Sequence, residues 1–293
     1  MLAVAGSLNL DLVARVPHIA APGETVLGST LARHQGGKGG NQAVAAARLG
    51  APVRFFGAVG SDDFGGELAA ALVAEGIDTA GVQRVPGPSG CALISVADDG
   101  ENAISVLPGA NGHAPRPPGT WPKQLRALLL QLEIPLATVR AWAESAHAAG
   151  VPVWLNAAPM AALPAALLPL VDLLVVNEGE LAALGAADVA AAAKLGPRRV
   201  VVTLGARGAV AWSDGRCIEQ PAHAVRVVDS TGAGDSFVGA LAASLWQGRP
   251  FDEALHRAGV AAALACTKLG AREGLPTADE LDAAMTASTR GIR

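Results

Sequence analysis

Short runs of valine, leucine and isoleucine alternate along this chain with alanine-rich stretches that end at a glycine. The expected strands are 2–5, 151–155, 173–176 and 200–203, and the expected helices are 41–49, 63–75, 235–247 and 252–269. Glycine can adopt the left-handed conformation that ends a helix, so Gly50 and Gly76 mark helix ends. Strands that alternate with helices are typical of an α/β fold with a parallel sheet covered by helices.

The stretch DSTGAGDSF, residues 229–237, places carboxylates on both sides of a glycine pair that opens a helix. Gly232, Ala233 and Gly234 carry almost no side chain, so their N–H groups can approach an anion where the helix dipole favours negative charge. A carboxylate at that position, Asp235, is suited to take a proton from an alcohol that attacks phosphorus. Taken alone, Asp235 equally fits a helix-capping aspartate.

A second glycine cluster, HQGGKGGNQ, covers residues 34–42. It fits neither the GxxxxGK[ST] phosphate loop nor the GxGxxG dinucleotide pattern. Its glycines allow close approach of a small polar ligand, to which Lys38 and Asn41 can donate hydrogen bonds. Asn9 and Asp11 follow the first strand and point the same way, so they can grip neighbouring hydroxyls. A loop that only caps a helix, and turn residues at 9 and 11, are the alternatives.

Three segments, 25–34, 91–97 and 102–107, have strand character without an intervening helix, and DDGEN supplies a hairpin turn between the last two. With residues 12–16 they form a predicted small β-sheet lid inserted into one domain spanning 1–293. Phosphoryl transfer must exclude water, which gives such a lid a purpose.

Composition excludes several classes of protein. The net charge of −4 and the pI near 5.9 provide no basic surface for nucleic acid. Three cysteines without CxxC spacing suggest neither a disulfide framework nor a zinc site, and favour a reducing, cytoplasmic setting. The longest apolar run, near 161–176, is broken by Pro164, Pro169 and Asp172, so no membrane segment is expected.

Eight motifs in order make the chain similar to the ribokinase branch of the PfkB carbohydrate kinase family. They are GSLNLD, PGETV, GGKGGNQAVAAARLG, SDDFG, LQLEIP, VVNEGE, TLGARG and DSTGAGDSF. The resemblance covers nearly the whole chain. It implies a doubly wound, mostly parallel sheet with a β-sheet lid, which often forms a homodimer interface in this family.

The resemblance also assigns roles to residues. Asp235 would be the general base, with Gly232, Ala233 and Gly234 as the anion hole. The implied sugar-binding residues are Asn9, Asp11, Gly37, Lys38, Gly39, Gly40, Asn41, Glu133 and Asp235. The implied nucleotide-binding residues are Asn177, Thr203, Leu204, Gly205, Ala206, Arg207, Gly208 and Gly234. Arg207 fits a phosphate contact or a surface position, and we favour the surface.

Two cations are implied as well. Glu180, in the element NEGE, would organise Mg²⁺ with the phosphates of ATP, although Glu178 and Glu180 also fit helix-initiating acids. A K⁺ site would be formed by Asp229, Thr231, Ala265, Lys268, Gly270 and Gly274. Gly274 stands where relatives carry serine, and Gly259 where relatives place His or Asn against adenine.

The predicted function is therefore ATP-dependent phosphorylation of a sugar, with D-ribose and its O5 favoured by GGKGGNQ and PGETV. Deoxyribose, a ketose, a sugar acid or a nucleoside are alternative substrates within the family. A non-catalytic sugar-binding regulator would have no need of Asp235 and Glu180, and a nicotinamide oxidoreductase is disfavoured because no GxGxxG follows the first strand.

Overall fold

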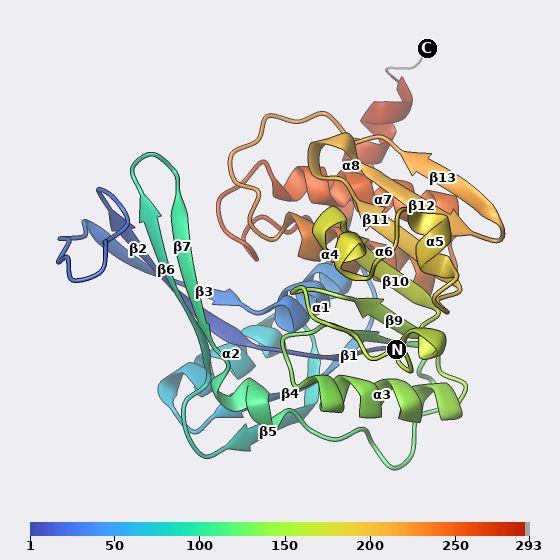
Figure 1. The fold of residues 1–293 in the computed structure, drawn as a ribbon, viewed down its shortest axis with the longest axis horizontal. Helices are drawn as coiled ribbons and strands as arrows, with labels where there is room; N and C mark the ends of the chain where they lie inside the picture. Colours follow the sequence, from blue (N-terminus) through green and yellow to red (C-terminus); the bar gives the residue numbers. More distant parts are fainter. Residues whose placement is uncertain (291–293) are drawn as a thin grey trace.

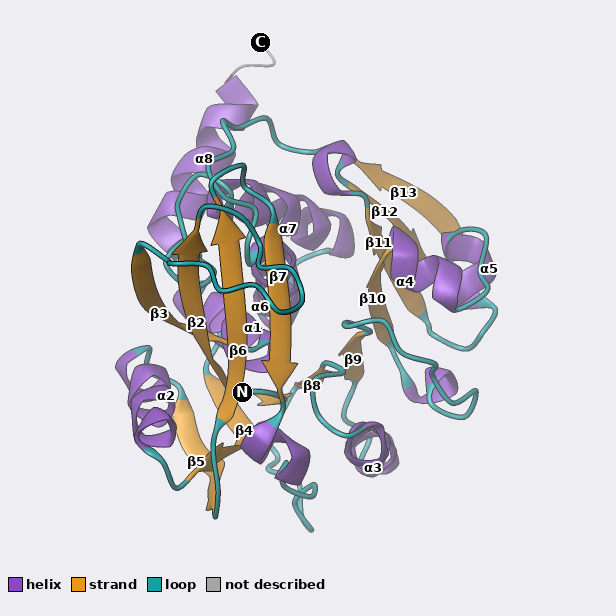
Figure 2. Cartoon of the chain, turned by 60° about the vertical axis from the view of Figure 1, so that its left-hand side comes forward, coloured by secondary structure: helices purple, strands orange, loops and turns teal. Residues whose placement is uncertain are grey.

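The computed structural model describes residues 1–290, and the side chains of residues 1–287. A nine-stranded sheet runs through the molecule in the order β13-β12-β11-β10-β9-β8-β1-β4-β5 (Figures 1 and 2). Its strands are β1 (Leu2–Ala5), β4 (Val53–Gly60), β5 (Asp78–Val85), β8 (Ala127–Leu130), β9 (Val153–Asn156), β10 (Leu173–Asn177), β11 (Arg199–Thr203), β12 (Ala209–Ser213) and β13 (Arg216–Gln220). All neighbours pair in parallel except β11–β12 and β12–β13. The expected mostly parallel sheet is confirmed.

Both faces of this sheet are covered by helices, because alternate residues of its strands are apolar on each side. In β1, Leu2 and Val4 pack into one core while Ala3 and Ala5 pack into the other. The first core lies under α1 (Lys38–Arg48), α2 (Asp63–Ala74), α6 (Ala233–Trp246), α7 (Phe251–Ala265) and α8 (Ala278–Arg290). The second lies under α3 (Leu136–Ala148), α4 (Glu178–Ala183) and α5 (Val189–Ala193), on the opposite side of the sheet in Figure 2. The sheet is doubly wound, as predicted.

A separate four-stranded sheet rises beside the large one, in the order β3-β2-β6-β7 (Figures 1 and 2). Its strands are β2 (Asn9–Val16), β3 (Thr30–Gly36), β6 (Gly90–Ala97) and β7 (Asn102–Leu107). The predicted strand over 25–34 was wrong at both ends, since pairing begins at Thr30 and continues to Gly36. Residues 17–29 form the β2–β3 connection, in which the Glu24 carboxylate bonds to His18 and to the Ala21 N–H. Those bonds favour a folded loop over an extended strand.

Helix α1 begins inside the second glycine cluster, earlier than the expected position 41. Gly37 precedes it with φ +85°, a conformation that favours glycine. A Cβ at Gly39 would lie 2.6 Å from the Ser7 nitrogen, so the helix approaches the β1–β2 segment more closely than a side chain would permit. The glycines therefore bring the start of α1 against the end of β1.

Three short 3₁₀ turns complete the described chain: Gly109–His113, Leu168–Leu170 and Gly205–Arg207. Among the helices of residues 1–290, none combines the length and the apolar character needed to cross a bilayer.

Candidate active site

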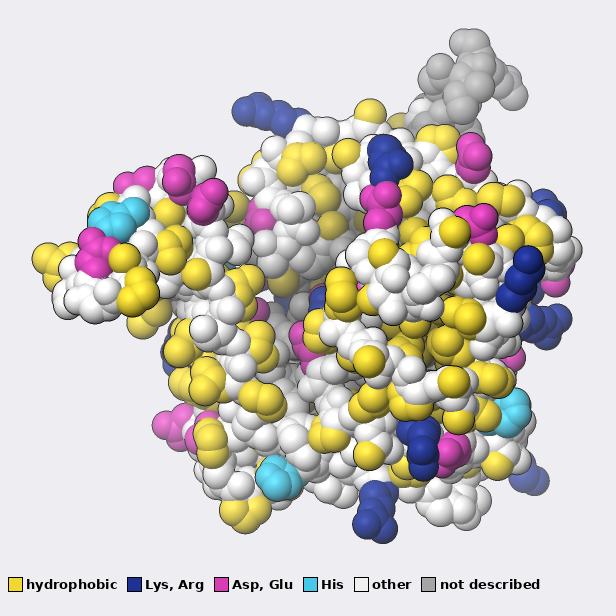
Figure 3. All heavy atoms as spheres, viewed as in Figure 1, with side chains coloured by type: hydrophobic (Ala, Val, Ile, Leu, Met, Phe, Trp, Pro, Cys, Tyr) yellow, Lys and Arg dark blue, Asp and Glu magenta, His cyan; other side chains and the backbone are white. Residues whose placement is uncertain are grey.

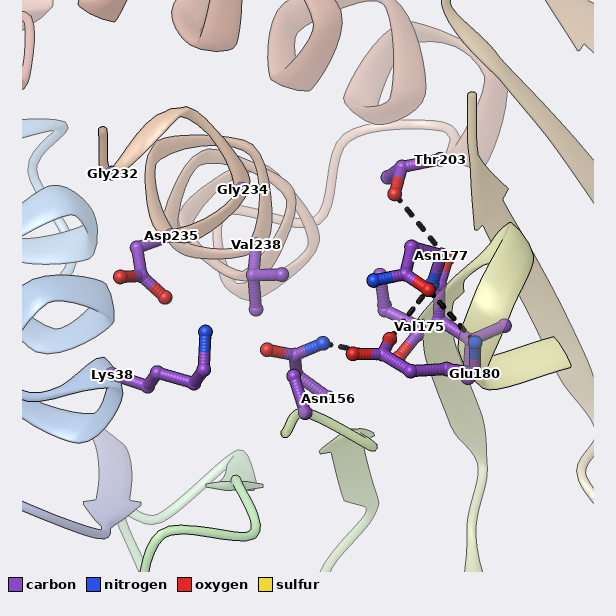
Figure 4. A pocket seen from close by; sticks show the side chains of 12 residues that line it. Lys38, Asn156, Val175, Asn177, Glu180, Thr203, Gly232, Gly234, Asp235 and Val238 are labelled. Carbon is purple, nitrogen blue, oxygen red and sulfur yellow. Dashed lines mark hydrogen bonds between the residues drawn. The ribbon is translucent and has the colours of Figure 1, made fainter. Parts of the chain in front are cut away.

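A cavity of about 150 Å³ opens where the first turns of α1 and α6 face the carboxyl ends of β9, β10 and β11. Parallel strands with helices on both faces place a site at this edge of the sheet. Figure 4 shows the Lys38 ammonium and the Asp235 carboxylate pointing into the same space. The wall consists of Lys38, Asn156, Ala158, Val175, Val176, Asn177, Glu180, Thr203, Gly232, Gly234, Asp235 and Val238.

Asp235 lies in the first turn of α6 and is only 8% exposed. Asn41 Nδ2 donates to its Oδ2 at 3.0 Å, and Gln42 Nε2 donates to its Oδ1 at 2.9 Å. Both donors come from α1, so the contact between these two helices fixes the plane of the carboxyl group. The group is held as a hydrogen-bond acceptor on both oxygens.

A chain of buried amides continues behind Gln42. Its Nε2 also donates to Asn156 Oδ1 at 2.9 Å, and its Oε1 accepts from Gln131 Nε2 at 2.7 Å. Asn156 Nδ2 donates in turn to the Val175 carbonyl. We did not assign Gln42, Asn156 or Gln131 from sequence. Gln42 and Gln131 stand within the motifs GGKGGNQ and LQLEIP, but Asn156 ends an ordinary strand and carries no local signal.

Helix α6 begins at a turn that requires glycine. Gly232 has φ +79°, and a Cβ there would lie 2.8 Å from the Ala271 carbonyl oxygen, so any larger residue would have to move the backbone. Gly232 and Gly234 line the cavity. The N–H of Ala233 donates to the Ser230 carbonyl at 3.2 Å. Two members of the predicted anion hole, Gly232 and Gly234, therefore face the cavity.

The predicted sugar-binding residues gather around the start of α1. Glu133 Oε2 accepts from the Ser7 hydroxyl at 2.6 Å and from the Lys38 N–H at 2.9 Å. Because β8 ends at Leu130, Glu133 stands in the loop that follows this strand. Asn9 Oδ1 accepts from Asn111 Nδ2. Asn111 was not predicted from the sequence to be part of the site.

Two of the predicted sugar-binding glycines serve packing. The Gly40 N–H donates to the Ser7 carbonyl at 3.0 Å, and the Gly39 N–H to the Ser7 hydroxyl at 3.3 Å. A Cβ at Gly40 would lie 2.2 Å from Arg272 Nη2. These contacts join α1 to the β1–β2 segment and to the loop before α8.

Asp11 is a half-buried acid with an incomplete set of partners. Its Oδ1 is buried without a hydrogen bond, and its carboxylate leaves no room for a Cβ at Gly36. Burial, together with the negative charge of Glu133, raises its pKa to about 6. A buried acceptor without a donor costs free energy, so a ligand hydroxyl at this position would be favoured.

At the other end of the cavity, Asn177 and Glu180 cap helix α4 reciprocally. Asn177 Oδ1 accepts from the Glu180 N–H at 2.8 Å, and Glu180 Oε2 accepts from the Asn177 N–H at 2.8 Å. Glu180 therefore caps the start of a helix, which was the alternative considered for it, and it also lines the cavity. Burial raises the pKa of Glu180, and a bound cation would lower it again by favouring the charged form.

The predicted nucleotide segment lies mostly outside this cavity. Asn177, Thr203 and Gly234 line it, whereas Gly205, Ala206 and Arg207 form an exposed turn and Leu204 and Gly208 flank that turn. The Arg207 guanidinium pairs with Glu178 at the surface, the position that we favoured for it.

The residues of the predicted K⁺ site meet beside α6. Asp229 accepts from the Thr231 N–H and hydroxyl and from the Gly270 N–H at 2.9 Å. The carbonyl oxygens of Ala265 and Gly270 lie 2.8 and 2.9 Å from where a Cβ of Gly274 would stand. A serine would therefore not fit at 274 without displacing them. The Lys268 ammonium pairs with Glu280, so this residue can offer only its backbone.

The donor sets fit the two cations differently. Backbone carbonyl oxygens, such as those of Ala265 and Gly270, can replace the water shell of K⁺. Within residues 1–290, no cluster of three or more His, Cys, Asp or Glu side chains could hold a metal by itself. Mg²⁺ retains several waters and is commonly shared with substrate phosphates, so a lone acid such as Glu180 is compatible with it.

The sequence of this chain is similar to those of known proteins. The sequence pattern described as pfkB family carbohydrate kinase matches residues 1–278. A ribokinase from Haemophilus influenzae is 40% identical over 294 residues, covering 95% of this chain and 96% of the relative. These matches extend over nearly the whole sequence.

Solved structures show the same fold. A ribokinase from Thermotoga maritima superposes with a TM-score of 0.90 at 32% identity, covering 98% of this chain and 99% of the other. A ribokinase from Arabidopsis thaliana, solved with ribose and ATP, superposes with a TM-score of 0.86 at 33% identity, covering 97% and 98%. The predicted ribokinase-like fold is confirmed. This chain belongs to the pfkB family of carbohydrate kinases and is an ATP-dependent sugar phosphotransferase.

Proposed function

We propose that this enzyme transfers the γ-phosphoryl group of ATP to O5 of D-ribose, with Asp235 as the general base. The observation that carries the proposal is the buried Asp235 carboxylate, oriented by two amides of α1 beside a glycine-lined helix start. A base fixed in this way can accept the proton of a primary hydroxyl as that oxygen attacks phosphorus.

Ribose is supported by the polar groups beside Asp235. Asp11 and Glu133 can accept from hydroxyls, and Lys38 can donate to them. The unpartnered Oδ1 of Asp11 would gain its missing hydrogen bond from a sugar hydroxyl. A site that leaves a buried group unpaired when one hydroxyl is absent discriminates against deoxy analogues. The similar Arabidopsis ribokinase was solved with ribose and ATP, which supports the same assignment.

The transferred phosphoryl group would be bound by the N–H groups of Gly232 and Gly234 at the positive end of α6. Asn177 and Glu180 would hold Mg²⁺ through its water shell, and the ion would reduce the negative charge of the phosphates. Thr203 and the exposed turn after it would lie along the nucleotide. Asp229, Thr231, Ala265, Lys268, Gly270 and Gly274 would hold K⁺, mainly through backbone carbonyls.

The test is an ADP-release assay of the purified enzyme over pentoses, deoxyribose, ketoses, sugar acids and nucleosides, each with and without K⁺. We expect ribose to give the largest kcat/KM and K⁺ to increase it. A preference for a nucleoside or a ketose would replace ribose while keeping the kinase. No turnover on any substrate would favour the non-catalytic regulator.

We also propose that the small sheet acts as a lid and as a homodimer surface. Asp11 pairs in register with Ala92, so the alternate residues Leu31, Leu93 and Leu107 lie on the face opposite Asp11. These three apolar side chains are 69%, 48% and 49% exposed, and Figure 3 shows hydrophobic side chains at the surface of the small sheet. A second copy of this sheet would cover them. Sedimentation of the wild type and of Leu93→Glu tests this surface, and an unchanged oligomeric state would contradict it.

The three cysteines are free thiols. We propose a reducing, cytoplasmic setting on that basis.

A further inference from the structure

Arg272 is a buried cation close to the proposed base, Asp235. Arg272 was not identified from the sequence. It stands in the loop between α7 and α8, and only 5% of it is exposed. Its Nε donates to Asn41 Oδ1 at 2.9 Å, and its Nη2 donates to the Gly36 carbonyl at 3.0 Å. The same Asn41 side chain donates from Nδ2 to Asp235. Arginine, amide and carboxylate thus form one directed chain.

This series of hydrogen bonds determines the orientation of the Asn41 amide. An amide has one acceptor end and one donor end. With Arg272 present, the oxygen faces the guanidinium and the NH₂ group faces Asp235. The flipped amide would place its NH₂ group against a cation that only donates and its oxygen against a carboxylate that only accepts. Both contacts would be repulsive, so Arg272 selects the orientation that supports Asp235.

The surrounding chain is built to admit this arginine. A Cβ at Gly40 would lie 2.2 Å from Arg272 Nη2, so the third residue of α1 has to be glycine where the guanidinium packs against it. Glycine inside a helix lowers stability, and burial of the guanidinium adds a further cost. Burial lowers the pKa of Arg272 to about 10, opposed by Asp11 and Asp235, so it stays charged at neutral pH.

We propose that Arg272 is a positioning residue for phosphoryl transfer: it orients Asn41, and Asn41 in turn holds Asp235 in line with the attacking hydroxyl. The proposal rests on Asp235 being the base, as proposed above. Arg272 itself touches no reacting atom in this assignment. Its loss should lower kcat, because a small misplacement of a catalytic group has a large effect on rate.

The experiment compares wild type, Arg272→Met, Asn41→Ala and the double variant on the best sugar from the ADP-release screen. We expect Arg272→Met to lower kcat by about 10- to 100-fold with little change in KM for ATP. In the Asn41→Ala background the same substitution should lower kcat by less than about threefold, because the two residues act in series. An undiminished loss in that background would overturn the proposal.

A matched control separates positioning from support of the loop. The Arg48 guanidinium donates to the carbonyls of Arg272 and Leu275, so it holds the same loop without touching Asn41. Arg48→Met should lower the melting temperature and leave kcat within about threefold. Arg272→Lys keeps the charge but offers a single ammonium, and should recover part of the lost rate. Equal losses of kcat in Arg48→Met and Arg272→Met would contradict a positioning role.

A second readout needs no turnover. In ¹⁵N-labelled protein, the side-chain NH₂ signals of Asn41 are identified by their disappearance in Asn41→Ala. Arg272→Met should shift these signals, whereas Arg48→Met should leave them in place. If no sugar were turned over, the proposed function would fail and this measurement would still decide the orientation of Asn41. Unchanged Asn41 signals in Arg272→Met would overturn the positioning role of Arg272 without affecting the proposed function.

Discussion

The two ends of the cavity are built differently. At the end that holds the proposed base, Asn41 and Gln42 are buried and both donate to the buried Asp235 carboxylate. At the proposed nucleotide end, Asn177 and Glu180 bond to each other, and Gly205, Ala206 and Arg207 form an exposed turn beyond the cavity. A proton acceptor has to be held in place in advance, whereas a nucleotide supplies many contacts of its own. The difference predicts where substitutions will affect turnover.

The largest effect should come from Asp235→Asn. Asparagine is no base, and it presents only one acceptor where Asp235 accepts from two amides. We expect kcat to fall by about 10²- to 10⁴-fold, measured by ADP release with saturating sugar. ATP affinity, measured by calorimetry, should be nearly unchanged because the nucleotide end is intact. Retention of more than a tenth of the wild-type kcat would remove Asp235 from the role of base.

A smaller effect is expected from Gly232→Ala. Alanine at φ +79°, with its Cβ 2.8 Å from the Ala271 oxygen, would distort the turn that opens α6. We expect kcat to fall about tenfold and the free energy of unfolding to fall by about 1–3 kcal/mol in urea denaturation. Gly234→Ala is the matched stability control, since a Cβ there meets nothing within 4 Å. Equal losses of stability in both variants would show that the strain at Gly232 is not the cause.

The raised pKa of Asp11 predicts how protein stability depends on pH. Its pKa is raised to about 6 in the folded protein from a reference of 3.8, so ionisation of Asp11 opposes folding above about pH 6. That cost declines as the pH falls from 6 and is absent below about 4. Asp11→Asn should therefore increase the free energy of unfolding by about 2 kcal/mol at pH 8 and by little near pH 4. Urea denaturation at both values checks this, and a gain independent of pH would contradict it.

The smallest effect is expected at the nucleotide end, from Arg207→Ala. The guanidinium is exposed and pairs with an exposed Glu178, so solvent screens the interaction. We expect an unchanged melting temperature, an unchanged kcat and a KM for ATP within about threefold of the wild type. A tenfold increase in that KM would mean that Arg207 contacts a phosphate, and would weaken the contrast between the two ends.

Much of this protein could be predicted from sequence because the signals are local. The alternation of apolar strands with helices predicted the parallel sheet, and DSTGAGDSF predicted a glycine turn opening a helix with Asp235 inside it. The small sheet was predicted from strands without helices between them, although its 25–34 segment was misplaced. There the composition suits an extended chain, but ladder pairing begins only at Thr30, and Glu24 bonds to His18 and to the Ala21 N–H within the loop.

What the sequence determined by itself is therefore the fold class and the chemical types present at the site, since both follow from short-range patterns of residues. The tertiary structure alone decided which groups touch. Arg272 meets Asn41 only because the loop before α8 returns to the start of α1, and Asn156 meets Gln42 only because β9 ends beneath that helix. Such contacts join residues distant along the chain, and their hydrogen bonds depend on packing that no local pattern encodes.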